Sequence, residues 1–119
     1  MELNYKVINH EMAEVKLAEL TADTYLIQSV DDGLQLLGDM YYSGFDAIIL
    51  HSKNIVPDFF DLKNKMAGEI LQKFSNYRMR LFIVGDFSSV SSKSLSDFIR
   101  ESNKGKQVNF VGSLDEILA

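Results

Sequence analysis

The sequence contains no cysteine, a single proline and fewer basic than acidic residues. Without cysteine the chain has no disulfide, thiolate metal ligand, thiol nucleophile or thiol redox switch. Its 12 basic residues against 17 acidic ones give a formal charge of -5, so the electrostatic footprint of a nucleic-acid or anionic-membrane binder is missing. A local basic patch is still compatible with this balance. We therefore expect neither nucleic acid nor membrane among the partners.

Long apolar runs are also missing. The N-terminal stretch MELNYKVINHEMAEVKL carries acidic residues and has neither the basic flank nor the apolar run of a signal peptide, and no later segment would span a bilayer. We expect a soluble, cytoplasmic protein. What is present, 119 residues at 46% hydrophobic with seven scattered glycines, is typical of one globular domain over residues 1–119.

The N-terminal segment YKVINHEMAEVKLAEL alternates between apolar and polar residues around a short polar break at Asn9 to Glu11. This pattern predicts a hairpin at the edge of a sheet, with His10 in its turn. The other histidine, His51, lies far away in sequence, and neither HxxH nor HExxH spacing occurs. No metal site and no cofactor are predicted.

Helices and buried strands then alternate. A capping pair, Ser29 and Asp32, and a helix-ending Gly44 predict a helix over about residues 30–43. The runs FDAIILHS, RMRLFIVGDF and QVNFVG have the apolar, β-branched character of strands that are buried on both faces.

Three further helices follow these strands. One is predicted to begin at Pro57, a second lies in SSKSLSDFIRESNKG, and a short one opens at Ser113 and Glu116. The helix that begins at Pro57 should bury one apolar face, which consists of Phe60, Met66, Ala67, Ile70, Leu71 and Phe74. Strands separated by single helices must be parallel, so we predict an α/β fold whose mixed sheet has an N-terminal hairpin and three parallel strands.

This order of elements resembles the anti-sigma-factor-antagonist (STAS) fold. The run PDFFDLKNKMAGEILQKFSNYRMRLFIVGDFS, followed by SKSLSDFIRESNKG, is similar to a family of small bacterial proteins catalogued as domain-of-unknown-function family 4180. The resemblance covers nearly the whole chain. It implies the STAS-like fold and a bacterial origin, but it brings no established activity.

Antagonists of the STAS class are phosphorylated on a serine at the start of the helix after this first parallel strand, and the phosphate charge blocks a kinase-like partner. Between Asn54 and Lys63 this sequence has no serine, threonine or tyrosine, so that switch is absent. Asp58 or Asp61 could imitate a permanently negative site at the helix start. Alternatively, Asp58 is the N-cap and Asp61 completes the helix entrance, which is the reading we favour.

Two adjacent phenylalanines, Phe59 and Phe60, cannot both lie centrally on one buried helix stripe, because consecutive helical residues point about 100 degrees apart. Phe60 fits the apolar face, so Phe59 either plugs the strand-to-helix corner or is partly exposed. An exposed Phe59 beside Tyr42 and Lys63 would anchor a protein interface, including one between two copies of the chain.

Ligands of α/β sheets usually bind at the carboxyl ends of the parallel strands. His51 and Asp86 follow two of these strands and could form a pocket with the serine-rich loop 88–94. No serine occupies a strand-turn-helix elbow, so we assign no catalytic residue.

The same loop leads into a helix. Ser91, Ser92, Lys93 and Ser94 could bind an anion at this helix start, although helix capping alone would also explain these residues.

Two functions of different kinds therefore remain. The first, which we favour, is a non-enzymatic interaction and regulatory module that binds an unknown protein partner or a second copy. The alternative is a small anionic-ligand or enzymatic site at the strand ends.

Overall fold

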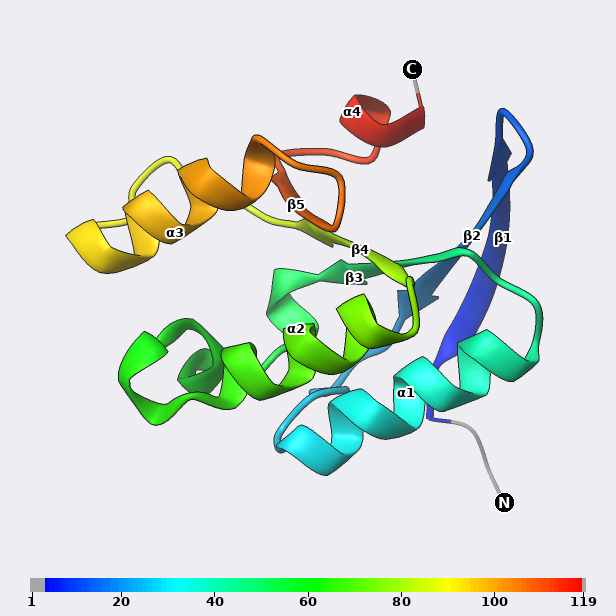
Figure 1. Ribbon diagram of the computed structural model, residues 1–119, viewed down its shortest axis with the longest axis horizontal. Helices are drawn as coiled ribbons and strands as arrows, with labels where there is room; N and C mark the ends of the chain where they lie inside the picture. The colour runs from blue at the N-terminus through cyan, green and yellow to red at the C-terminus, as the bar shows by residue number, and fades with distance from the viewer. Residues whose placement is uncertain (1–3, 119) are drawn as a thin grey trace.

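Five strands form one mixed sheet, and the computed structural model describes residues 4–118 of the chain (Figure 1). The strands are β1 (Lys6–Met12), β2 (Val15–Thr21), β3 (Ala47–His51), β4 (Arg80–Val84) and β5 (Val108–Val111), and they lie in that order across the sheet. The β1–β2 pair is antiparallel, and the remaining pairs are parallel. This confirms the predicted α/β class, with β2 as a fourth parallel strand beside the three expected.

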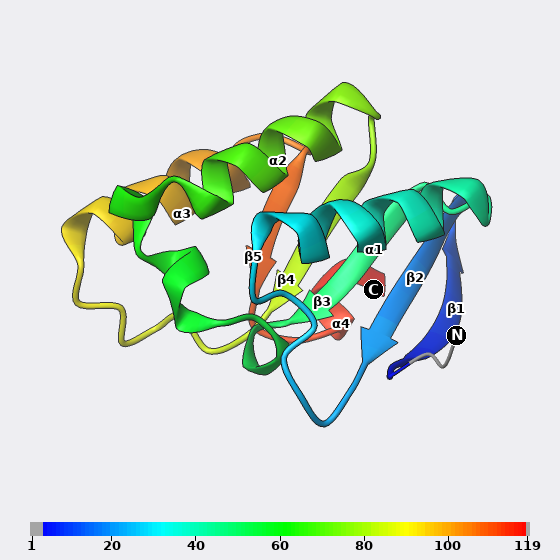
Figure 2. The same cartoon turned by 90° about the horizontal axis from the view of Figure 1, so that it is seen from below.

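Three helices connect neighbouring parallel strands: α1 (Val30–Tyr42), α2 (Met66–Asn76) and α3 (Lys93–Asn103). Right-handed crossovers that all step in the same direction across a sheet place their helices on one face. Figure 2 shows α1, α2 and α3 together on one side of the strands. Among residues 4–118 there is no helix with the length and apolar composition that a membrane span requires.

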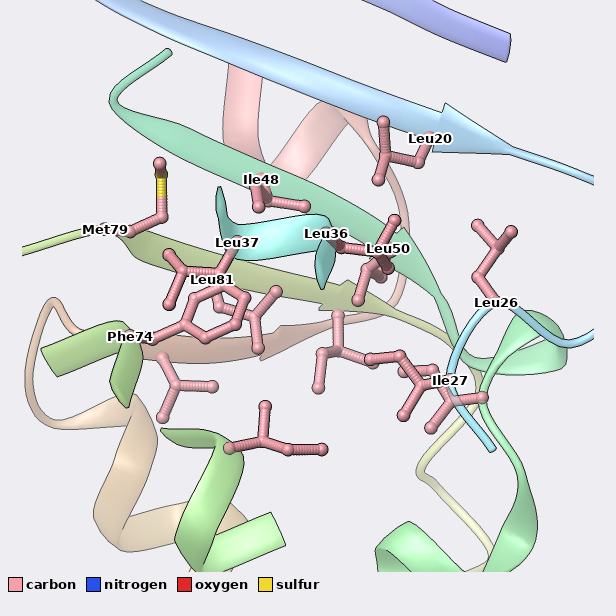
Figure 3. Packing of buried hydrophobic residues seen from close by; sticks show 14 of the residues in the cluster. Leu20, Leu26, Ile27, Leu36, Leu37, Ile48, Leu50, Phe74, Met79 and Leu81 are labelled. Atoms are coloured by element: carbon pink, nitrogen blue, oxygen red, sulfur yellow. The ribbon is translucent and has the colours of Figure 1, made fainter. Parts of the chain in front are cut away.

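The main core lies between these helices and the sheet, as seen in Figure 3. Alternate residues of a strand point to opposite faces. Ile48 and Leu50 of β3 therefore face the helices, whereas Ala47 and Ile49 belong to a smaller cluster on the opposite face. That second face is covered by the short helix α4 (Asp115–Leu118) through Ile117.

Local hydrogen bonds explain where α1 begins and ends. The Asp32 N–H donates to Ser29 Oγ at 3.2 Å, and the Asp32 carboxylate accepts from the Gln28 N–H at 2.9 Å. Gly44 follows the helix with a φ of 89°, which glycine adopts without the Cβ clash of other residues. The predicted helix is confirmed to within one residue at its end.

The predicted hairpin turn was wrong. The polar residues Asn9 to Glu11 continue β1, and the turn is the pair Ala13 and Glu14, with φ angles of 48° and 71°. Two residues with positive φ give a turn whose twist matches that of the flanking strands. His10 is consequently a strand residue, opposite Leu17 of β2.

The segment after β3 also differs from the prediction. Residues Pro57–Phe60 and Leu62–Asn64 form 3-10 turns, η2 and η3, and α2 begins only at Met66. Asp61 accepts a hydrogen bond from the Lys63 N–H at 3.2 Å, and Asn64 accepts one from the Met66 N–H at 2.9 Å. These side-chain bonds replace the backbone bonds of a continuous helix. Asp58 is therefore not the N-cap of α2.

Candidate functional site

Phe59 is a core residue. Only 1% of its surface is exposed, and its ring meets that of Phe60 with centroids 5.1 Å apart. It fills the corner between β3 and α2, which is one of the two positions expected for Phe59. The other expectation, an exposed interface anchor, was wrong. Phe60, expected on the buried face of the helix, precedes that helix and is partly buried against the core.

Tyr42, the second predicted partner-binding residue, is 86% exposed at the end of α1. Its ring lies against Tyr41 at 5.5 Å between centroids, and Tyr41 contacts Tyr77, which follows α2, at 5.1 Å. Both contacts are edge-to-face. Because Tyr41 and Tyr77 are each 46% exposed, the three rings form an aromatic surface, which we call the tyrosine cluster.

Lys63, the third predicted partner residue, is exposed and belongs to a different surface. It lines a groove of about 490 Å³ between the turns before α2 and the start of α3. The other lining residues are Pro57, Phe60, Asp61, Leu62, Ser92 and Ser94. Lys63 and two serines of the predicted anion loop therefore meet at one groove, away from Tyr42.

The serine loop is occupied by local contacts. Ser92 is the N-cap of α3, and its Oγ accepts from the Leu95 N–H at 3.2 Å. Lys93 Nζ lies 2.9 Å from the Asp97 carboxylate. Ser91 and Ser94 are exposed. Capping therefore accounts for Ser92, and an intrahelical ion pair accounts for Lys93.

His51 and Asp86, the predicted strand-end pair, have different partners. Asp86 Oδ1 accepts from the Ser88 hydroxyl at 2.6 Å and from the Ser88 N–H at 3.0 Å. These bonds, the hydroxyl bond above all, lower the pKa of the Asp86 carboxyl. The His51 ring is bonded to Glu19 instead.

Glu19 lies between two histidines from the neighbouring strands. The Nε2 of His10 on β1 is 2.8 Å from Glu19 Oε1, and the Nε2 of His51 on β3 is 2.7 Å from Glu19 Oε2. The strand pairing places all three residues on the second face of the sheet, with Ile49 and Leu17. We call this arrangement the His–Glu–His cluster.

Glu19 is a buried acidic residue, of whose surface 7% is exposed. Burial raises the pKa of Glu19, but the hydrogen bonds and charges of His10 and His51 act in the opposite sense and leave the pKa below its ordinary value. The buried carboxyl is therefore ionised at neutral pH. Within residues 4–118, no three histidine, cysteine or acidic side chains are arranged to hold a metal ion.

The roles of His10 and Glu19 were not predicted from the sequence. The three residues of the cluster are far apart in sequence, and only the register of β1, β2 and β3 brings them together. One signal was present: Glu19 interrupts an otherwise apolar stretch of β2, and buried charges are rare unless they are paired.

The fold and these surfaces define a protein of the α/β class with a mixed five-stranded sheet. The chain belongs to the family described as Domain of unknown function (DUF4180), whose model matches residues 12–119. No curated protein and no solved structure matches the chain.

Proposed function

We propose that this protein is a non-enzymatic interaction module that binds another protein through the tyrosine cluster. The observation that carries the proposal is the 86% exposure of Tyr42, whose ring stands on Tyr41 at the end of α1. Tyrosine offers a large contact area with few rotatable bonds and is enriched in the centres of protein interfaces. The proposal includes a regulatory role for the module. It also includes a STAS-like fold, a bacterial origin and a cytoplasmic location.

The contacts of Tyr41 add support. Its ring is in edge-to-face contact with both Tyr42 and Tyr77, so rings at the end of α1 and just after α2 brace one another. A braced ring loses less conformational freedom when a partner binds, which favours affinity. The partner is expected to cover all three rings.

The alternative, an enzymatic or small-anion site at the strand ends, has less support. His51 and Asp86 are bonded to different partners, Glu19 and Ser88. Ser92 Oγ is bonded to a backbone N–H, and Lys93 Nζ is paired with a carboxylate. A catalytic apparatus would need a nucleophile, a base and an orienting group within mutual reach.

Site-specific photocrosslinking tests the proposal. A photoreactive phenylalanine replaces Tyr42 in one variant and the exposed Lys104, at the end of α3, in a matched control. We expect a crosslinked protein, either a partner or a second copy, from position 42 and not from position 104. Equal crosslinking at both positions, or none at position 42, would contradict the proposal.

A binding measurement with the crosslinked partner then separates the ring from its hydroxyl group. Tyr42→Ala should weaken binding about tenfold or more, which corresponds to ~1.4 kcal/mol. Tyr42→Phe keeps the ring and should retain most of the affinity. Unchanged binding by Tyr42→Ala would remove Tyr42 from the interface.

A further inference from the structure

The hydrogen bonds of the His–Glu–His cluster determine where its protons lie. An ionised carboxylate only accepts hydrogen bonds, so each ring nitrogen that contacts Glu19 must carry a hydrogen. The contacting atoms are Nε2 of His10 and Nε2 of His51, and each reaches a different oxygen of the carboxylate. Both neutral rings are therefore Nε2–H tautomers, in which Nδ1 is unprotonated.

We infer that His10, Glu19 and His51 form a proton-binding site on the second face of the sheet, in which incoming protons bind at Nδ1 of the two rings. Histidine is the side chain that ordinarily changes charge near physiological pH. With neutral rings the cluster carries one negative charge from Glu19. With both rings protonated it carries one positive charge, so its charge reverses while both hydrogen bonds to Glu19 are kept.

The hydrogen bonds of Glu19 support this order of protonation: burial raises the pKa of Glu19, but the bonds from the two rings outweigh burial and hold the pKa below its ordinary value. The carboxylate stays ionised while the rings take up protons, and each imidazolium becomes a charge-assisted donor to it. Protonation of the rings therefore does not break the cluster.

Solvent reaches both rings. The side chains of His10 and His51 are 19% and 24% exposed, whereas that of Glu19 is 9% exposed. Protons can therefore enter and leave from the surface without unfolding.

Charged groups other than the cluster come from several elements of this face. Strand register puts Lys6 of β1 and Arg80 of β4 on the same face as Glu19. Arg80 donates to the Lys106 carbonyl at 2.6 Å and lies over the Phe82 ring. The helix α4 contributes Asp115 and Glu116, and Glu116 is bonded to the N–H groups of Gly112 and Ser113. Glu11 and Lys16 form the register pair next to His10, so their charges point to the opposite face of the sheet.

The consequence concerns recognition. Ile8, opposite Glu19 in the β1–β2 pair, is 43% exposed on the same face as the cluster. A partner that touched this face would meet an apolar side chain beside a group whose charge reverses with pH. This inference is independent of the tyrosine cluster, which belongs to the ends of α1 and α2.

Nitrogen-15 NMR of the imidazole rings tests the inference directly. The sequence contains two histidines, and both belong to the cluster, so each signal reports on it. At alkaline pH we expect both rings as Nε2–H tautomers, with Hε2 protected from solvent exchange. On mild acidification each ring should gain its proton at Nδ1. The carbon-13 chemical shift of the Glu19 carboxyl group should stay that of a carboxylate. An Nδ1–H tautomer in the wild type, or a Glu19 carboxyl that protonates in the same step, would overturn the inference.

Glu19→Gln provides a second test, with Glu69→Gln on exposed α2 surface as the matched control. A glutamine amide offers one accepting oxygen and one donating nitrogen. One ring must therefore switch to the Nδ1–H tautomer or lose its protected Hε2 signal, while Glu69→Gln leaves both rings unchanged. Two unaltered rings in Glu19→Gln would also overturn the inference. If this variant does not fold, the wild-type tautomers still decide the question.

Discussion

On the face of the sheet that α1, α2 and α3 cover, the buried residues of β3 and β4 are apolar, whereas the opposite face holds Glu19 between two histidines. The first face is stabilised by the close packing of apolar side chains. The second is partly stabilised by hydrogen bonds to a buried charge. The difference follows from topology, because three crossovers place all the long helices on one side. The two faces should therefore respond to different perturbations.

The largest effect is expected on the helical face. Phe59→Ala removes a ring that is 1% exposed and leaves a cavity, so it should lower the free energy of unfolding by about 3–5 kcal/mol. Urea denaturation measures this change. A loss below about 1 kcal/mol would mean that Phe59 is not packed in the core.

Close packing of α1 on α2 gives the next prediction. A Cβ added at Gly33 would lie 2.9 Å from side-chain carbons of Ile70, whereas one added at Gly38 would meet, beyond its own stretch of helix, no atom of residues 4–118 within 4 Å. Gly33→Ala should destabilise the protein by about 1–3 kcal/mol through overpacking. Gly38→Ala, in the same helix, should stabilise it by about 0.5–1 kcal/mol through its helix propensity. We expect the midpoint of thermal unfolding to fall in Gly33→Ala and to rise in Gly38→Ala. Equal shifts of the two midpoints would contradict this prediction.

The second face should be sensitive to chemistry at constant volume. Glu19→Gln keeps the shape of the side chain but leaves one histidine without its acceptor, which should cost about 1–3 kcal/mol at neutral pH. Glu69→Gln, on an exposed helix surface, should change stability by less than about 0.5 kcal/mol. Similar stabilities for the two variants would show that the His–Glu–His cluster contributes little.

The smallest effect is expected at the tyrosine cluster. Tyr42→Ala removes a ring that is 86% exposed, so the free energy of unfolding should change by no more than about 0.5–1 kcal/mol. The contrast with Phe59→Ala separates a surface aromatic from a core aromatic. A destabilisation as large as that of Phe59→Ala would show that Tyr42 has a structural role.

Much of the fold could be predicted because its signals are local. The buried strands are continuous apolar runs, and α1 is bounded by the Ser29 cap and by Gly44. The hairpin turn could not be predicted, because Ala13 and Glu14 are not residues that favour positive φ, whereas the polar residues around His10 resemble a turn. The error placed His10 in a loop and so hid its contact with Glu19.

The candidate site was predicted less well than the fold. Tyr42 was predicted as an interface residue beside Phe59, but its contacts with Tyr41 and Tyr77 depend on how α1 and α2 pack. The direction of Phe59 stayed open in the sequence, because two 3-10 turns replace the start of the predicted helix and change the direction of every side chain there. Neither the tyrosine contacts nor the 3-10 turns around Phe59 leave a pattern in the sequence.

The pH dependence of unfolding in Glu19→Gln and Phe59→Ala tests the difference between the two faces most directly. Because the pKa of Glu19 is lowered in the folded state, its contribution is complete above the unfolded value of 4.5 and is lost as pH falls through the folded pKa. The stability difference between wild type and Glu19→Gln should therefore shrink in this acidic range, while that between wild type and Phe59→Ala stays constant. A Glu19→Gln difference that persists through acidification, or a Phe59→Ala difference that shrinks with it, would contradict the account.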